Sequence, residues 1–268
     1  MEDLQILPLK TDKSSITLKT PINPILPDLG ANFVLLIFAP RGSGKTTLYS
    51  NLLLNPNFFK RENYEHAFII SSTIYQDLSA KALRDHFADT LYDRYDGSII
   101  NNLIKYQRSF ELCERPKTIL ICDDICGINM KEVDYGVTRF RHDNISCIYS
   151  TQQSRSVRKV VRLNATDVIV GATKNWKEIE DIYEEYGMLY GSLEMWIQMF
   201  RYATAKPYSF LYMKIDKKPY RAFVNFSEDI THKFKETSNK RLFSCGTNDN
   251  KLDEPIDKIN NYKNDLVE

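Results

Sequence analysis

The 268-residue sequence has no excess of charge of one sign, because 36 lysine and arginine residues balance 35 aspartate and glutamate residues to a net charge of +1. This balance argues against a histone-like protein that coats nucleic acid through bulk charge, although it leaves room for a local basic surface. Long hydrophobic runs are also missing, since no apolar stretch approaches the ~20 residues that a membrane-spanning helix needs. The N-terminal residues MEDLQILPLK lack the basic start and the apolar stretch of a signal peptide. We therefore expect a soluble intracellular protein with no membrane contact.

Cysteines are few and irregularly spaced. None of the five belongs to a CxxC pair, so a zinc site is not expected. Three of them lie in or beside apolar, strand-like runs, where a free cysteine usually behaves as a small buried hydrophobic residue. This usage is typical of a reducing compartment. The cysteines are Cys113, Cys122, Cys126, Cys147 and Cys245.

The sequence does contain enough apolar material for a core, because 43% of its residues are hydrophobic and 12% are aromatic. This composition rules out disorder as a general description. From residue 33 onward, strand-like and helix-like segments alternate, which is typical of a mainly parallel α/β sheet covered on both faces. We predict strands at 33–39, 66–73, 117–123, 145–151 and 167–171, and helices at about 45–54, 76–89, 98–113, 131–141 and 157–163.

The C-terminal part of this pattern predicts one more helix and a hairpin. Asn175 is suited to the N-cap of the helix, Glu178 follows three positions later and Gly187 comes after its end. Segments 209–215 and 221–226 flank a polar turn and predict an antiparallel hairpin that closes one edge of the sheet. The helix carries an apolar stripe at helical spacing, which we interpret as core: Trp176, Ile179, Tyr183 and Tyr186.

The most informative segment is Ala39-Pro-Arg-Gly-Ser-Gly-Lys-Thr46, which matches the P-loop pattern with Ala39 in place of the first glycine. Glycines at 42 and 44 allow several backbone N–H groups to point at one anion. Lys45 would reach the β- and γ-phosphates, and the Thr46 hydroxyl would bind Mg²⁺. The segment lies between an apolar strand and a helix, as a P-loop requires. We predict that ATP contacts Arg41, Gly42, Ser43, Gly44, Lys45, Thr46 and Thr47.

A P-loop needs a second strand that ends in a carboxylate. The apolar run Thr118–Asp123 ends in Asp123 and is followed by Asp124. We predict that Asp123 orients Mg²⁺ and that Asp124 orients or deprotonates the attacking water. The next strand ends in Gln152 and Gln153. If that strand lies between the other two, Gln152 would sense the γ-phosphate and help to position the water, with Gln153 the weaker candidate.

Two segments carry candidate arginines. Arg139 and Arg141 lie just before the fourth strand, where an arginine could reach the γ-phosphate of a neighbouring subunit and stabilise the transition state. Arg141 is our first choice for this role and Arg139 the second, and an ordinary surface role is the alternative. The second segment contains Arg155, Arg158 and Arg162 and no acidic residue. It could contact a phosphate backbone, place Arg162 at the nucleotide, or form an ordinary solvated helix face.

Together these features resemble the genome-packaging ATPases of poxviruses, giant viruses and virophages, a branch of the FtsK–HerA superfamily of P-loop ATPases. The resemblance spans about residues 30–172 and rests on a P-loop strand, a strand ending in Asp-Asp, Arg141-His142 before a strand ending in Thr-Gln, and Arg162-x-Asn-x-Thr166. The sequence departs from the pattern at Ala39, which replaces the usual glycine. It also has Asp124 where cellular relatives carry glutamate, although the poxvirus-type enzymes resemble it in having Asp-Asp there.

The resemblance implies a RecA-like (ASCE) P-loop NTPase fold in which the Gln152 strand lies between the other two. It implies a homo-oligomeric ring, commonly a hexamer, that moves double-stranded DNA into a preformed capsid, with Arg141 supplied in trans and capsid or portal-vertex proteins as partners. Such a protein would act in the host-cell cytoplasm at viral assembly sites, and retention in the virion is compatible with this role. The expected organisation is an extended arm at 1–32, an ATPase domain at 33–228 and a polar tail at 229–268.

Two other classes of function stay open. A nucleotide-switched virion assembly factor, like the P-loop morphogenesis proteins of filamentous phages, would usually carry a membrane-spanning segment. A small-molecule P-loop kinase would need an arginine-rich lid and an acceptor pocket, and it would place no Gln-ended strand beside an Asp-Asp strand.

Overall fold

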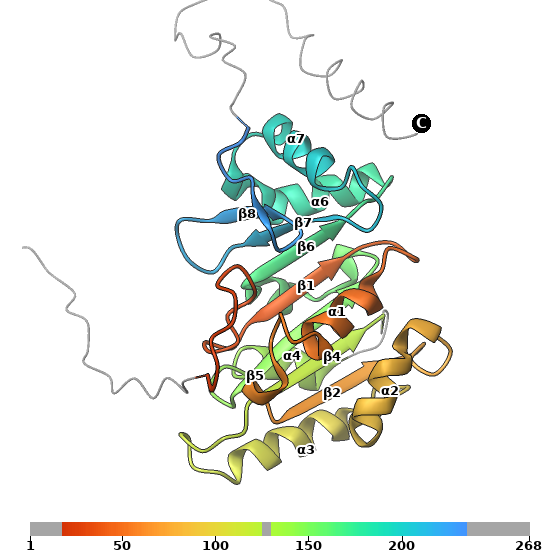
Figure 1. The fold of residues 1–268 in the computed structure, drawn as a ribbon, viewed down its shortest axis with the longest axis vertical. Helices are drawn as coiled ribbons and strands as arrows, with labels where there is room; N and C mark the ends of the chain where they lie inside the picture. Colours follow the sequence, from red (N-terminus) through yellow and green to blue (C-terminus); the bar gives the residue numbers. More distant parts are fainter. Residues whose placement is uncertain (1–17, 125–129, 235–268) are drawn as a thin grey trace, which may run out of the picture.

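The computed structural model describes residues 18–124 and 130–234. Cys126, Cys245, most of the expected arm and nearly all of the expected tail lie outside the described residues. Within them, nine strands form one sheet in the order β3-β2-β4-β5-β1-β6-β7-β8-β9 (Figure 1). Strands β1 to β6 pair in parallel, whereas β7, β8 and β9 add an antiparallel edge. The predicted α/β fold with a C-terminal hairpin is thus confirmed.

The strands of this sheet are short, between two and seven residues. They are β1 Val34–Phe38, β2 His66–Ser71, β3 Leu91–Tyr92, β4 Thr118–Asp123, β5 Ile145–Thr151, β6 Asp167–Gly171, β7 Phe210–Lys214, β8 Arg221–Val224 and β9 Glu228–Asp229. The α-helices are α1 Lys45–Leu54, α2 Lys81–Phe87, α3 Gly97–Arg108, α4 Lys131–Val137, α5 Lys159–Leu163, α6 Trp176–Glu185 and α7 Leu193–Ala203.

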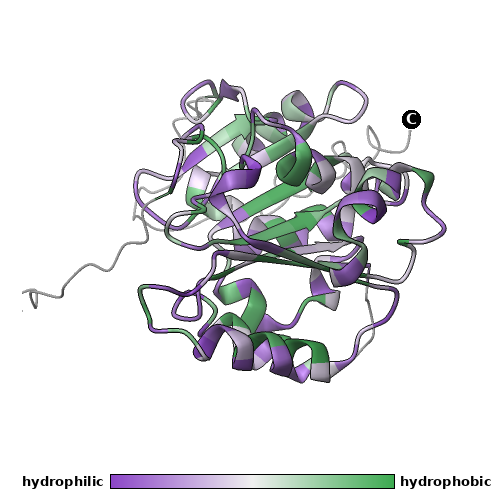
Figure 2. Cartoon of the chain, turned by 60° about the horizontal axis from the view of Figure 1, so that its bottom comes forward, coloured by the Kyte–Doolittle hydropathy of each residue, from purple (hydrophilic) through white to green (hydrophobic). Residues whose placement is uncertain are grey.

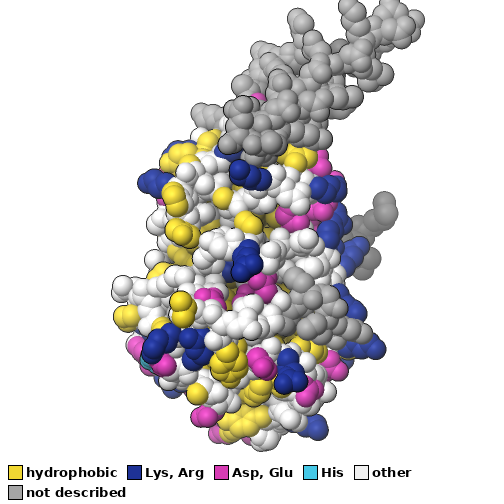
Figure 3. Space-filling model, turned by 90° about the vertical axis from the view of Figure 1, so that its right-hand side faces the viewer, with side chains coloured by type: hydrophobic (Ala, Val, Ile, Leu, Met, Phe, Trp, Pro, Cys, Tyr) yellow, Lys and Arg dark blue, Asp and Glu magenta, His cyan; other side chains and the backbone are white. Residues whose placement is uncertain are grey.

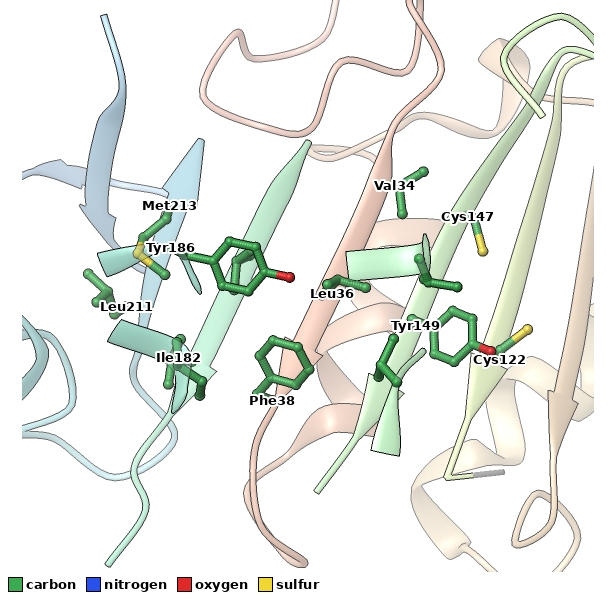
Figure 4. Packing of buried hydrophobic residues seen from close by; sticks show 14 of the residues in the cluster. Val34, Leu36, Phe38, Cys122, Cys147, Tyr149, Ile182, Tyr186, Leu211 and Met213 are labelled. Carbon is green, nitrogen blue, oxygen red and sulfur yellow. The ribbon is translucent and has the colours of Figure 1, made fainter. Parts of the chain in front are cut away.

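The sheet has a hydrophobic core on each face, because alternate side chains of a strand point to opposite sides. In β1, Leu35 and Ile37 join the cluster that α1 and α2 cover, whereas the other β1 side chains join the cluster under α3 to α7. Figure 2, coloured by residue hydropathy, shows the hydrophobic residues concentrated along the strands of the sheet and on parts of the helices. Figure 4 shows the second cluster, in which Phe38 stacks on Tyr186, the residue that follows α6, at 6.5 Å between ring centroids.

Several predictions made from individual residues are confirmed by this core. The Asn175 side chain caps α6 by accepting hydrogen bonds from the N–H groups of Lys177 and Glu178. The aromatic and aliphatic stripe of α6 packs into the core as predicted. Cys122 and Cys147 are fully buried on neighbouring strands, as small hydrophobic residues would be.

The structure also contains elements that the sequence pattern did not predict. Helix α7 begins after Ser192, whose side chain accepts a hydrogen bond from Met195, and it buries Trp196 against Phe200 with the rings 5.6 Å apart. Strand β3 is only two residues long and extends the sheet beyond β2. The expected helix at 76–89 is shorter, because the Asp77 side chain caps a 3-10 turn that precedes α2.

The packed body extends past both expected domain limits. Leu26 and Leu29, assigned to the arm from sequence, are buried against the α1 side of the sheet, and the Lys214 amino group donates to the Leu26 carbonyl at 2.7 Å. At the other end, β9 pairs with β8 and Ile230 is buried. None of the helices in the described ranges is both long and apolar enough to span a bilayer.

Candidate active site

The P-loop, Asp123, Asp124 and Gln152 meet where β1, β4 and β5 end. Strand β5 lies between β1 and β4, as the resemblance implied, with Phe38 opposite Thr151 and Asp123 opposite Ser150. A hollow of about 1240 Å³ opens at this edge and is lined by the P-loop, both aspartates and Gln152. Figure 3 views the molecule from this side, and basic and acidic side chains lie next to each other near its centre. The volume is enough for a ligand of nucleotide size.

The P-loop has the backbone geometry for which its glycines were predicted. Gly42 has φ 77° and Gly44 has φ 87°, both in the left-handed region that favours glycine. No side chain caps α1 after Gly44 and its first turn has no acidic residue, so the first N–H groups of the helix can face an anion. Ala39 fits in place of a glycine because its neighbour on β6 is Gly171, where a Cβ would lie only 2.7 Å from the Ala39 Cβ.

Lys45 is the buried cation of the site. Its side chain is 7% exposed, and its amino group donates to the carbonyls of Ala39 at 3.0 Å and Pro40 at 3.3 Å. The same nitrogen lies 3.6 Å from the Asp124 carboxylate. The amino group therefore faces the loop interior, where bound phosphates would be enclosed by it and by the N-terminus of α1.

Asp123 is a buried carboxylate suited to a divalent cation. Tyr49 and Ser71 donate hydrogen bonds to its Oδ2 at 3.1 and 2.9 Å, while its Oδ1 is buried without a partner among the described residues. Burial raises the pKa of Asp123, and the charge of Asp124 raises it further. A cation would offset this cost by favouring the ionised form. A hard oxygen donor set of this carboxylate and the Thr46 hydroxyl fits Mg²⁺.

Asp124 stands between Lys45 and Gln152. Its backbone has a φ of 45°, uncommon for a residue other than glycine, and its N–H donates to the Ser150 carbonyl at 2.9 Å. This conformation directs its carboxylate toward the P-loop, where Oδ2 accepts a hydrogen bond from the Gln152 amide at 3.4 Å. The neighbouring Gln153 does not line the hollow. The structure thus brings together the predicted base and the predicted sensor.

The sequence reasoning missed a contribution from the end of β2. Ser71, next to β4 in the sheet, bonds to Asp123, and Asp77 lines the hollow beyond it. Burial raises the pKa of Asp77, but hydrogen bonds from Ser79 and Thr46 outweigh it, so the pKa is lowered. The sequence did contain a signal for this contribution, because the second predicted strand ends in Ser-Ser-Thr. Parallel strands end on the same side of a sheet, so these hydroxyl groups could have been expected near the Asp-Asp pair.

The other P-loop residues predicted to contact the nucleotide also line the hollow. Arg41 is exposed at its rim, and it is the single arginine among the lining residues in the described part of the chain. The Ser43 hydroxyl donates to the Pro40 carbonyl at 2.7 Å and so closes the loop on itself. Thr47 is exposed at the start of α1. Besides the buried Lys45, the loop therefore presents one exposed cationic side chain, that of Arg41.

The candidate arginines fall into two groups. Arg155 pairs with Asp181 at 2.7 Å, Arg158 with Asp134 at 3.0 Å and Arg162 with Glu185 at 2.7 Å. These pairs anchor the segment after β5 to α4 and α6. Arg162 does not line the hollow, so the option of Arg162 at the nucleotide of its own subunit is not realised. This segment is held by ion pairs rather than left as an unpaired basic patch.

Arg139 and Arg141 are different, because both are exposed and neither forms an ion pair with the residues that the structure describes. They lie before β5, at the edge of the sheet opposite to the P-loop. Asp143 fixes the turn by binding Arg108 at 2.9 Å and Arg115 at 3.4 Å. The Asn32 side chain donates to the Arg141 carbonyl at 3.2 Å.

Comparisons with known proteins give no match to a protein-family model and none among curated proteins. Solved structures do match. The crystal structure of B204, the DNA-packaging ATPase from Sulfolobus turreted icosahedral virus, superposes with a TM-score of 0.52 at 17% identity, covering 71% of this chain and 96% of that one. The genome packaging NTPase B204 from Sulfolobus turreted icosahedral virus 2, in complex with AMP, gives 0.51 at 18% identity over 72% and 96%.

The chain has the fold of these packaging NTPases. The resemblance inferred from the sequence is therefore confirmed at the level of the fold. The aligned part covers 96% of each B204 chain, so the likeness extends well beyond the P-loop. The structure of B204 from virus 2 in complex with AMPPCP also matches, with a TM-score of 0.50.

Proposed function

We propose that this protein is an ATPase that moves viral double-stranded DNA into preformed capsids. The observation that carries the proposal is the meeting of Lys45, Asp124 and Gln152 over a P-loop, beside the buried Asp123, within a fold shared with the B204 packaging enzymes. The scarcity of arginine around the hollow speaks against a kinase lid, as far as the described residues extend.

In this proposal the loop N–H groups and Lys45 bind the β- and γ-phosphates of ATP. Gln152 holds the attacking water in line with the γ-phosphorus, and Asp124 accepts a proton from that water. The water oxygen bonds to the γ-phosphorus while the bond from that phosphorus to the β–γ bridging oxygen breaks. Asp123 and Thr46 would hold Mg²⁺, which neutralises charge on the phosphate oxygens when bound. The products are ADP and inorganic phosphate.

The position of Arg141 supports the proposal of a ring. Strand β5 is seven residues long, which separates its two ends by roughly 20 Å, so Arg141 cannot reach the nucleotide of its own subunit. In a homo-oligomeric ring, for which a hexamer is our first expectation, the arginine edge of one subunit would face the P-loop edge of the next. Each subunit is nearly neutral, but in a ring every subunit would add its few basic side chains to the same pore. The combined positive charge of the pore would then be enough to bind DNA. Capsid or portal-vertex proteins complete the proposed set of partners, at assembly sites in the host cytoplasm.

The test of this function is the ATPase rate per subunit, measured against protein concentration with and without long double-stranded DNA. We expect the rate to climb with concentration, because active sites shared between subunits form only on assembly, and to rise further with DNA. A rate per subunit that changes neither with protein concentration nor with DNA would favour the nucleotide-switched assembly factor. Transfer of phosphate to a small acceptor in place of water would favour the kinase.

Asp124→Asn is expected to bind ATP with nearly unchanged affinity and to lower kcat by about 10²–10⁴-fold, because an amide cannot accept the proton of the attacking water. Single-turnover hydrolysis together with equilibrium ATP binding separates these two effects. Asp89→Asn is the matched control, since Asp89 is exposed and does not line the hollow. A normal kcat in Asp124→Asn would assign the base to another group.

A further inference from the structure

The loop between α7 and β7 forms one wall of the hollow. Residues 207–210 line it, on the side of the P-loop away from the strand that ends in Asp123. Tyr208 is 77% exposed, yet its ring lies close to the P-loop: its Cδ1 is 3.3 Å from the position that a Cβ on Gly44 would occupy. The ring therefore lies against the start of α1 and leaves most of its surface open.

Tyr208 is held in this place at a conformational cost. Its φ of 62° lies in the left-handed region, which residues other than glycine, asparagine and aspartate rarely adopt. The loop around it is fixed, since the Ser209 hydroxyl donates to the Lys206 carbonyl at 2.6 Å and the Phe210 N–H donates to Asn225 at 3.1 Å. Phe210 also packs on Phe226, with the rings 5.3 Å apart. An exposed aromatic ring with a strained backbone contributes little to folding, which points to a role in binding.

We propose that Tyr208 is the stacking platform for the base of the nucleotide. The phosphates would occupy the loop from Gly42 to Thr46, and the base would extend along the same hollow to the wall formed by residues 207–210. An aromatic ring binds any base through its face. The Ser209 hydroxyl already donates to a backbone carbonyl and is not available to donate to a base edge. The platform should therefore bind adenine and guanine with similar strength.

This inference rests on the proposed nucleotide site, and the experiment separates the two. Calorimetric titrations of the full chain with ATP, GTP and inorganic tripolyphosphate, each with Mg²⁺, report the base and phosphate contributions separately. Tyr208→Ala is expected to weaken ATP and GTP binding alike by about 5- to 100-fold, the effect of removing one stacking ring. Its affinity for tripolyphosphate should stay within about twofold, because tripolyphosphate has no base to stack.

Three further variants make the result specific. Tyr208→Phe keeps the ring and should bind ATP as the wild type does. Tyr208→Gly removes both the ring and the strain at φ 62°, so it should melt no lower than the wild type and still lose ATP affinity. Tyr135→Ala, which removes a ring that is 76% exposed outside the hollow, should leave all three affinities unchanged.

Undiminished ATP binding by both Tyr208→Ala and Tyr208→Gly would overturn the platform and leave the P-loop assignment intact. An equal loss for tripolyphosphate would also overturn it, because Tyr208 would then act on the shape of the phosphate loop through Gly44. A wild-type protein that binds neither ATP nor tripolyphosphate would remove the proposed nucleotide site and the platform with it.

Discussion

Lys45→Ala is expected to lower ATP hydrolysis by at least about 10²–10³-fold, the range observed when one preorganised donor to a developing charge is removed. The amino group lies over the P-loop, where it would neutralise the β- and γ-phosphates, and no other lysine lines the hollow in the described part of the chain. ATP binding should weaken as well, because the charge acts on the ground state too. Initial rates of phosphate release and equilibrium binding measure the two effects.

Lys81→Ala provides the control for this substitution. Lys81 is an exposed lysine that pairs with Asp85 on α2 at 2.6 Å, and the loss of such a surface pair costs little stability. A thermal melt of both variants checks that the fold is intact. Full turnover by a folded Lys45→Ala protein would remove the P-loop assignment and every proposal built on it.

Arg141→Ala is expected to abolish hydrolysis, with a loss of about 10³–10⁵-fold, the contribution of an arginine finger supplied in trans. The distance along β5 excludes action within one subunit, whereas the turn held by Asp143 leaves the side chain exposed to solvent, where a neighbouring subunit of the proposed ring would meet it. ATP binding to the variant should be unchanged, since its own P-loop is complete. Rates are measured at a protein concentration that saturates assembly.

Mixing decides whether the finger acts between subunits. Arg141→Ala retains a working P-loop and Lys45→Ala retains a working finger, so mixed assemblies should regain part of the activity that each variant lacks. Arg139→Ala is the matched comparison, because Arg139 is exposed on the same turn. If the mixture stays inactive, the finger in trans is wrong. If Arg139→Ala is inactive and Arg141→Ala is active, the role passes to Arg139.

The parts of the fold that were predicted well are those set by local patterns. The bounds of the helix after the P-loop and of strands β5 and β6 coincide with the structure, because long apolar or periodic runs lie between glycines and polar turns. Elements fixed by tertiary contacts were missed, notably β3, which is two residues long and becomes a strand only by pairing with β2. The burial of Leu26 and Leu29 could not be predicted from the sequence either, because the residues that cover them belong to α1 and the sheet, which are distant in the sequence.

The sequence by itself determined the P-loop, the Asp-Asp strand end and the Gln strand end. Each of these is a short motif, and the types of a few neighbouring residues are enough to indicate its chemistry. The tertiary structure confirmed the place of β5 between β1 and β4 that the resemblance implied. Only the tertiary structure showed the contacts that follow from this order, namely the Gln152 amide on Asp124 and the Ser71 hydroxyl, from the end of β2, on Asp123. It also paired Arg155, Arg158 and Arg162 with acids from other helices while leaving Arg139 and Arg141 exposed. The physical reason is that charge pairing and burial depend on which distant segments of the chain come into contact, and local sequence patterns do not predict those contacts.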